Sequence, residues 1–154
     1  MFITANFTRF WNFRSWNGYN DELVWGAAWL YKATGDVAYF NKAKKYYNDF
    51  SLEGKTGVFS WDDKTVGVHV LMAEFTGDKK YTDSLKKFCD NAVSGQTRSP
   101  GGMLHYAEWG SLRYASNAAF ICLQVKRIFC YCIHINNLFF FLYMTMMKRN
   151  VKYF

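Results

Sequence analysis

The sequence predicts an all-α fold built from helical hairpins, an α/α toroid or solenoid. The first observation is a repeat: Thr34-Gly35-Asp36 recurs 42 residues later as Thr76-Gly77-Asp78, with a tyrosine and a lysine pair following each copy at equal spacing. The second is that a largely apolar segment precedes each copy and an amphipathic one follows it. Glycine accepts the left-handed conformation that ends one helix, and aspartate caps the first N–H groups of the next.

The predicted helices alternate between inner and outer positions. The first is apolar on nearly every face, as a buried inner helix requires, and the second is amphipathic. The next two repeat this order, and a third unit begins after them, so that about two and a half hairpins are present. The predicted ranges, in chain order, are 21–33, 36–49, 66–75, 78–93 and 109–124.

Composition and charge exclude several classes of protein. The chain has 154 residues, of which 51% are hydrophobic and 21% aromatic, and this excludes a disordered or collagen-like chain. The net charge is +7, but residues 1–124 hold 14 basic and 12 acidic side chains, whereas residues 125–154 hold five basic and none acidic. Because the excess charge lies mostly in the C-terminal segment, no nucleic-acid partner is expected.

The four cysteines form no recognisable framework. They stand at positions 89, 122, 130 and 132, and no further Cys or His pair lies at zinc-binding spacing from Cys130 and Cys132. Free thiols are therefore the expected state of these residues.

Four sequence blocks occur in an order that resembles glycoside hydrolase family 9, the cellulases. They are SWNGYNDELVWGAAWLY at 15–31 followed by ATGD at 33–36, FSWDDK at 59–64, SPGG at 99–102, and WGSLRYA at 109–115 followed by NAAF at 117–120. The resemblance covers residues 15–124, about a quarter of that family's catalytic domain. It implies an incomplete (α/α)6 toroid, the architecture of the six-hairpin glycosidases.

The resemblance also implies hydrolysis of internal β-1,4-glucosidic bonds with inversion, which requires a carboxylic acid and a carboxylate base. In the family, the base belongs to an Asp-Ala-Gly-Asp motif before the matched region and the acid is a glutamate after it. Neither motif is present, and no acidic residue follows Glu108. We therefore expect no catalytic residue in this chain, and expect a cellulase fragment that is inactive alone. The alternatives are a non-catalytic glucan-binding remnant and a membrane-anchored helical protein.

The substrate implied by the resemblance is a β-1,4-glucan. Glucose rings present apolar faces, and a glucan site therefore needs exposed aromatic planes with polar groups beside them. The family positions that bind substrate correspond here to Trp16, Trp109, Arg113 and Tyr114. The residue types alone favour core positions for Trp16 and Trp109, and only the match to the family's motif assigns them to the cleft. We interpret the remaining tryptophans of the matched blocks as core residues: Trp25, Trp29 and Trp61.

No cofactor is required, but the resemblance implies a possible structural calcium. Its ligands would be the carboxylates of Asp21, Glu22 and Asp62, with backbone carbonyls around Asn17 and Gly18. The alternative is that Asp21 and Glu22 are the acidic residues that the dipole of a helix favours at its N-terminus.

The two ends of the chain differ from the matched region. We expect residues 1–14 to lie outside the resemblance and to hold no signal peptide, although secretion is expected of the full-length parent protein. Residues 125–154 contain no Ala, Gly, Pro, Ser or acidic residue, a composition that follows AT-rich codons, and we interpret them as intron read-through or a gene-model artefact. Residues 128–147 have the length of a membrane span, but the polar residues at its centre are costly in lipid, and a membrane anchor is not expected.

Overall fold

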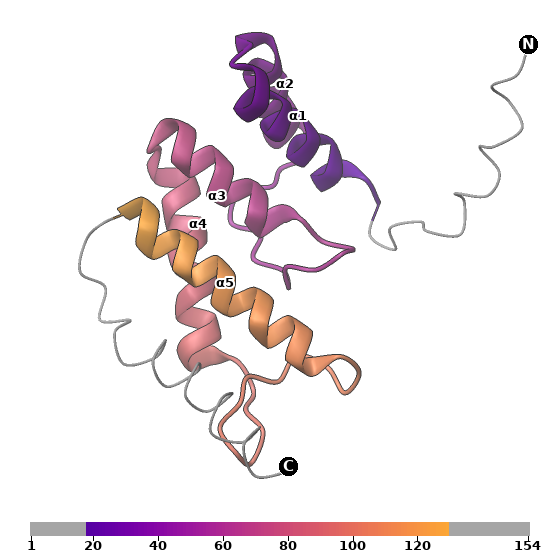
Figure 1. The fold of residues 1–154 in the computed structure, drawn as a ribbon, viewed down its shortest axis with the longest axis vertical. Coiled ribbons are helices and arrows are strands. Elements are labelled where there is room, and N and C mark those ends of the chain that lie inside the picture. The colour runs from indigo at the N-terminus through magenta and orange to yellow at the C-terminus, as the bar shows by residue number, and fades with distance from the viewer. Residues whose placement is uncertain (1–17, 130–154) are drawn as a thin grey trace, which may run out of the picture.

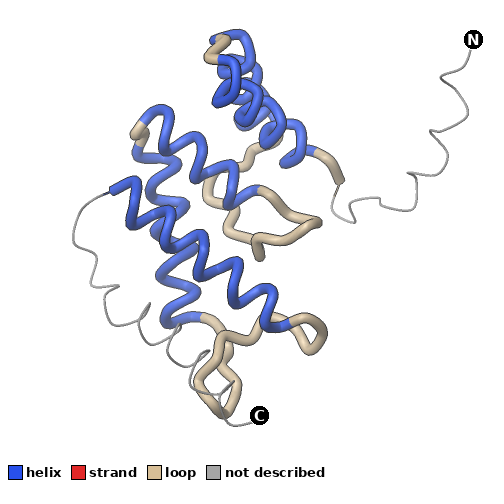
Figure 2. The backbone as a smooth tube through the Cα atoms, in the orientation of Figure 1, coloured by secondary structure: helices blue, strands red, loops and turns tan. Residues whose placement is uncertain are grey.

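The computed structural model describes residues 18–129, which form α-helices and connecting loops (Figure 1, Figure 2). Within these residues no strand forms, and the only β pairing is an isolated bridge between Arg98 and Leu104. The predicted all-α class is therefore confirmed. The helices are α1 (Asn20–Thr34), α2 (Val37–Asp49), α3 (Thr65–Thr76), α4 (Lys79–Asp90), the π-helix η2 (Asn91–Gly95) and α5 (Ser111–Phe129).

Helix α3 lies at the centre of the molecule. Its residues from Thr65 to Ala73 are all buried, and it packs against α1, α4 and α5 (Figure 1). Helix α2 packs on α1, and α4 packs on both α3 and α5. Helices α1, α3 and α5 thus form an inner row with α2 and α4 as the outer partners, which confirms the predicted alternation.

The two Thr-Gly-Asp motifs form the corners of the hairpins, as predicted. Gly35 and Gly77 adopt left-handed φ angles of 73° and 69°, and each N–H donates to the carbonyl oxygen four residues earlier. Asp36 caps α2, because its Oδ1 accepts from the N–H of Ala38 at 2.8 Å. The Asp78 side chain makes no such hydrogen bond, and the prediction that it caps α4 is wrong. Its carbonyl oxygen instead accepts from the N–H of Tyr81 at 3.2 Å.

The threonine of each motif has a role that the sequence did not indicate. Thr34 Oγ1 donates to the carbonyl of Leu30 at 2.7 Å and accepts from the N–H of Asp36 at 3.2 Å. Thr76 Oγ1 makes the equivalent pair of bonds with Met72 and Asp78 at 2.8 and 3.0 Å. The hydroxyl therefore joins the last turn of one helix to the start of the next, which explains why the whole tripeptide recurs.

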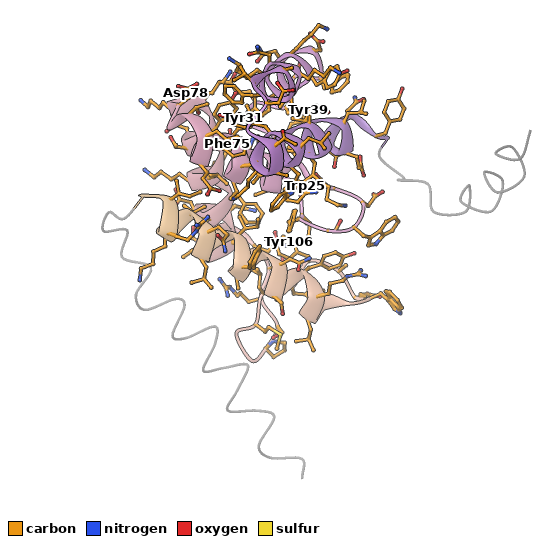
Figure 3. All side chains as sticks on the ribbon, turned by 45° about the horizontal axis from the view of Figure 1, so that its top comes forward. Trp25, Tyr31, Tyr39, Phe75, Asp78 and Tyr106 are labelled. Atoms are coloured by element: carbon orange, nitrogen blue, oxygen red, sulfur yellow. The ribbon has the colours of Figure 1, made fainter. Side chains whose placement is uncertain are left out.

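Aromatic side chains of α1 and α5 remain partly exposed where the two helices flank α3. Trp29 on α1 is 44% exposed and Phe120 on α5 is 52% exposed. The interpretation of Trp29 as a core residue is therefore wrong, because its ring lines a solvent-accessible pocket between α1, α3 and α5 and is not enclosed. Trp25 does pack against the core, with its ring 6.0 Å from that of Phe59. On the inner side of α1, the ring of Tyr31 meets that of Phe75 on α3 edge-on, with centroids 4.9 Å apart (Figure 3).

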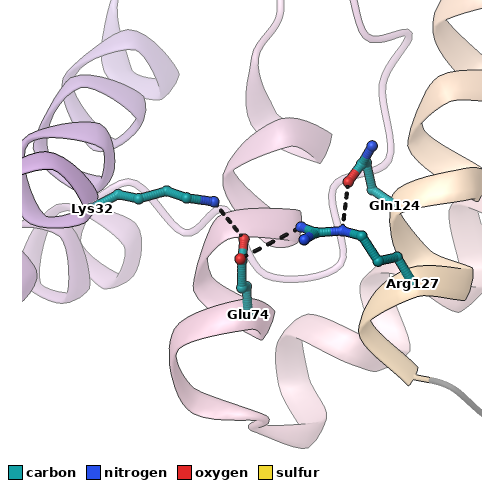
Figure 4. Close-up of polar contacts among 4 residues, drawn as sticks. All are labelled: Lys32, Glu74, Gln124 and Arg127. Atoms are coloured by element: carbon teal, nitrogen blue, oxygen red, sulfur yellow. Dashed lines mark hydrogen bonds and ion pairs between the residues drawn. The ribbon is translucent and has the colours of Figure 1, made fainter.

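A three-membered ion bridge joins the inner helices (Figure 4). Glu74 on α3 accepts from Lys32 on α1 at 2.8 Å and pairs with Arg127 on α5 at 3.5 Å. The hydrogen bond from Lys32 is the largest of the effects that lower the pKa of Glu74. Arg127 also donates to Gln124 at 3.0 Å.

The predicted boundary between residues 124 and 125 falls inside α5, which continues to Phe129 with Val125 fully buried. Within residues 18–129, no helix combines the length and apolar character that crossing a bilayer requires. The candidate span at 128–147 lies outside the described residues apart from its first two positions.

A buried histidine on α3 predicts a pH-dependent stability. His69 is fully buried; its Nε2–H donates to the carbonyl of Lys55 at 2.9 Å, and its Nδ1 accepts from the hydroxyl of Tyr47 at 3.2 Å. Burial lowers the pKa of His69, so that the unfolded chain, with a His pKa of about 6.5, binds the proton more readily. The contribution of His69 to the free energy of unfolding should therefore decrease as pH falls through about 6.5. Glu22, whose pKa burial raises to about 7, changes the stability in the opposite direction over the same range. Urea unfolding at pH 8 to 5 therefore compares the natural chain with His69→Gln: the difference in their free energies of unfolding should shift against the natural chain as pH falls, and a difference that does not change with pH would contradict the prediction.

A glycine in α3 predicts a packing effect. A Cβ added to Gly67 would lie 2.5 Å from the Trp25 ring and 2.7 Å from the Phe59 ring. Gly67→Ala should destabilise the fold by about 1–3 kcal/mol, because the two rings must move. Gly26→Ala on α1 is the matched control: its Cβ would meet no atom within 4 Å, and the helix should gain about 0.5–1 kcal/mol. Thermal unfolding of both variants measures the difference, and a stabilised Gly67→Ala variant would contradict the packing argument.

Candidate glucan-binding site

A tightly bonded loop at 59–64 holds one aromatic side chain at the surface. The Ser60 hydroxyl accepts from the N–H groups of Asp62 and Asp63, both at 3.2 Å. The ammonium of Lys64 donates to the carbonyls of Ser60 and Trp61. These bonds close the turn, and Trp61 remains 52% exposed at its outer side. The interpretation of Trp61 as a core residue is therefore wrong.

The start of α5 carries a second group of aromatic and cationic side chains. Trp109, just before the helix, is 82% exposed. The guanidinium carbon of Arg113 lies 5.8 Å from the centre of the Trp109 ring and 4.6 Å from that of Tyr114, and its Nη2 donates to the Tyr114 hydroxyl at 2.8 Å. Gly110 between them has a φ of 69°, and a Cβ there would lie 3.2 Å from the guanidinium. The glycine thus allows the arginine to fold back across the helix start.

A pocket of about 410 Å³ separates the loop from the helix start. Tyr106, which is labelled in Figure 3, and Tyr114 both line the pocket, with ring centroids 6.4 Å apart. Trp61 also contributes to the lining. Burial raises the pKa of Tyr106 to about 12, and its hydroxyl has no hydrogen-bond partner among the described residues. The pocket therefore combines aromatic rings with polar groups at its edge. The full lining is Val58, Ser60, Trp61, Asp62, Asp63, Tyr106, Ala107 and Tyr114.

The structure brings together three of the four side chains assigned to substrate binding from the resemblance. Arg113 contacts both Trp109 and Tyr114, while Trp16 lies outside the described residues. Two further pocket residues were missed. Trp61 stands in a matched block but was assigned to the core, and Tyr106 falls between the matched blocks, where no motif marked it.

The acidic residues assigned to calcium are only partly brought together. Asp21 and Asp62 line a second pocket of about 210 Å³, which also contains Asp63 and Lys55. Asp21 is buried, and its Oδ2 accepts from the backbone N–H of Lys64 at 2.5 Å. Between Gly18 and Phe129, no three acidic, His or Cys side chains are arranged so that they would hold a metal ion.

The carboxyl group of Glu22 lies beside that of Asp21 and has a raised pKa. Burial, followed by a hydrogen bond to the Asp21 side chain, raises the pKa of Glu22 to about 7. Its Oε2 is buried with no hydrogen-bond partner in the described part of the chain. Gly18 adopts a left-handed φ of 95°, and Asn17 lies outside the described residues. The calcium assignment stays a prediction.

Comparison with known proteins identifies the family. The model of glycosyl hydrolase family 9 matches residues 4–154. The chain belongs to this family. Endoglucanase B of Cellulomonas fimi is 43% identical over 122 residues, covering 72% of this chain and 12% of that protein. Endoglucanase A of Bacillus pumilus is 37% identical over 119 residues, covering 71% of this chain and 18% of the relative.

Solved structures of the family share the fold. An endoglucanase from the termite Nasutitermes takasagoensis superposes with a TM-score of 0.79 at 37% identity, covering 90% of this chain and 31% of that structure. Endoglucanase CelQ of Clostridium thermocellum, in complex with cellobiose and cellotriose, gives 0.72 at 26% identity, covering 90% of this chain and 25% of that structure. The described helices are thus part of an (α/α)6 toroid, and the chain spans well under a third of the curated relatives it matches.

Proposed function

We propose that this chain forms part of the catalytic domain of an endo-β-1,4-glucanase and supplies one wall of its glucan-binding cleft. The observation that carries the proposal is the exposed cluster of Trp109, Arg113 and Tyr114 beside the 410 Å³ pocket. Membership of glycosyl hydrolase family 9 and the endoglucanase relatives support it. We also propose that the parent protein is secreted, because a polymeric glucan substrate lies outside cells.

The side chains suit a sugar polymer for two physical reasons. Exposed indole and phenol rings stack on the apolar faces of glucose rings. The Arg113 guanidinium carries five N–H donors, of which one is used by the Tyr114 hydroxyl, so that others are available to sugar hydroxyls. The guanidinium lies over the rings of both Trp109 and Tyr114, which holds it in place and reduces the entropy lost when a sugar binds.

We further propose that the catalytic acid and base of the parent domain lie in other segments. An inverting glycosidase needs two carboxyl groups about 6.5–9.5 Å apart, on opposite faces of the sugar ring. Asp62 and Asp63 in the pocket are sequence neighbours, and Asp63 Oδ1 already accepts from the N–H of Thr65 at 2.8 Å. A chain that binds glucan without cleaving it is the alternative function that the same cluster supports.

Binding of cello-oligosaccharides tests the proposed wall. Titration calorimetry of the full chain with cellotetraose should detect binding, and Trp109→Ala should weaken it roughly tenfold because a stacking surface is lost. Trp29→Ala is the matched control, since it removes an exposed tryptophan of α1 that lies outside the pocket.

The outcomes separate the proposals. Absence of binding, or equal weakening by both variants, would contradict the glucan-binding wall. A reducing-sugar assay on carboxymethylcellulose should show no hydrolysis by the chain alone. Hydrolysis would show that the catalytic carboxyl groups lie within it, and would contradict their assignment to other segments.

We propose a structural calcium, with Asp21, Glu22 and Asp62 as ligands and the backbone around Asn17 and Gly18 completing the set. Because these three carboxylates do not form a ready metal cluster among the described residues, the ion would have to draw them together. A buried carboxylate oxygen without a partner, on Glu22, supports a missing cation. Hard divalent cations take several such oxygens. The carboxylates of Asp21 and Asp62, which share a pocket, supply the neighbouring charge.

Calcium should therefore stabilise the fold. Adding CaCl₂ at about ten times its Kd should raise the thermal midpoint by several degrees, since ligand binding contributes about 1.4 kcal/mol at that ratio. Asp21→Asn should abolish the rise while its side-chain oxygen still accepts from Lys64. Asp83→Asn, an exposed acid on α4, should retain the rise. An unchanged midpoint in the natural chain, or a rise that survives Asp21→Asn, would contradict the site.

A further inference from the structure

Two cysteines far apart in the sequence meet in the core. Cys89 on α4 and Cys122 on α5 are 3% and 4% exposed and 33 residues apart. Their Sγ atoms lie 2.6 Å from each other, with the thiol of Cys122 donating to that of Cys89. Unbonded heavy atoms prefer about 3.5–4.0 Å, and the S–S bond is about 2.05 Å. The packing of α4 on α5 thus brings the two sulfur atoms within reach of a bond.

The surroundings of Cys89 and Cys122 do not favour a role in metal binding or nucleophilic catalysis. Both residues belong to the apolar cluster that α3, α4 and α5 enclose, and between residues 18 and 129 no set of His, Cys or acidic side chains is placed to hold a metal. The hydrogen bond from Cys122 and burial both raise the pKa of the Cys89 thiol, which makes the thiolate rare in the folded state. Buried thiols of this kind are poor nucleophiles and poor metal ligands.

We propose that Cys89 and Cys122 form an intramolecular disulfide that ties α4 to α5 when the chain folds in the presence of a small-molecule disulfide. The thiolate of one cysteine attacks a sulfur of the small disulfide, releases one thiolate and leaves a mixed disulfide. The second cysteine then attacks the protein sulfur of that intermediate and releases the other thiolate. Two protein thiols are oxidised, one small disulfide is reduced to two thiols, and the two protons pass to the released thiolates.

The timing of the reaction follows from burial. Exchange requires a thiolate and access for the attacking disulfide, and both are restricted once α5 has packed on α4. The bond therefore forms during folding, before the core closes. Once formed, the same burial protects it from reducing agents.

Peptide mapping tests the proposal on the full chain. The chain is refolded with oxidised glutathione, its remaining thiols are blocked with an alkylating agent, and it is digested with trypsin. Cys89 falls in peptide 88–98, Cys122 in peptide 114–126, and the other two cysteines share peptide 128–148. We expect a linked species of 88–98 with 114–126, lighter than the sum of the reduced peptides by two hydrogen atoms and lost on reduction. Recovery of both peptides in alkylated form, or linkage of either to 128–148 as the main product, would overturn the proposal.

Thermal unfolding gives a second readout with matched variants. The disulfide would close a loop of 33 residues between Cys89 and Cys122. This closure should raise the thermal midpoint of the oxidised chain above that of the reduced chain by roughly 10 °C. The double variant Cys89→Ala/Cys122→Ala should lose this redox difference, whereas Cys130→Ser/Cys132→Ser should keep it. A difference that persists in the first double variant and vanishes in the second would assign the bond to the other pair.

Discussion

Complete burial of helix α3 is the constraint on which the rest of the described structure depends. Nine consecutive residues of this helix have no solvent-exposed face, with α1, α4 and α5 packed around them. Such a helix needs internal partners for its polar groups. His69 finds them in the Tyr47 hydroxyl and the Lys55 carbonyl, and the N–H of Thr65 finds one in the Asp63 carboxylate. Tyr47 lies on α2, and Lys55 and Asp63 lie in the segment between α2 and α3, so these bonds fix both the outer helix and the connecting segment against α3.

The start of α3 also connects the core to the candidate binding pocket. The bonds that satisfy its first N–H groups come from Asp63 and, through the N–H of Lys64, from Asp21 on α1. These residues belong to or contact the loop that carries Trp61 at the pocket edge. The opposite side of the loop is tied to α5, where the Asn117 side chain donates to the carbonyl of Phe59 at 2.9 Å. One wall of the pocket is therefore positioned by the same hydrogen bonds that order the core.

The hairpins and their corners follow from local chemistry, and that is why the sequence predicts them. A left-handed glycine and a run of apolar residues act within one or two helical turns, as at Gly35 and Gly77. The failures concern tertiary placement. Tryptophan is highly buried on average, which favours a core assignment for Trp29 and Trp61, but whether a given ring is enclosed depends on neighbours distant in sequence. Tyr106 carried no local signal at all, and the assignment of Arg113 rested on family resemblance.

The contacts among the inner helices also determine how firmly the cluster of Trp109, Arg113 and Tyr114 is held in place. An inner helix of a toroid is covered only when it has an inner neighbour on each side, and among residues 18–129 this holds for α3 alone. The cluster of Trp109, Arg113 and Tyr114 lies at the start of α5, a helix that also leaves Phe120 half exposed. The stability of α5 therefore depends on its contacts with α3 and α4. A disulfide between Cys122 and Cys89 would join α5, which carries the cluster, to the hairpin of α3 and α4, whose inner helix is fully enclosed. Such a bond would limit local unfolding of α5 and so keep the cluster in place.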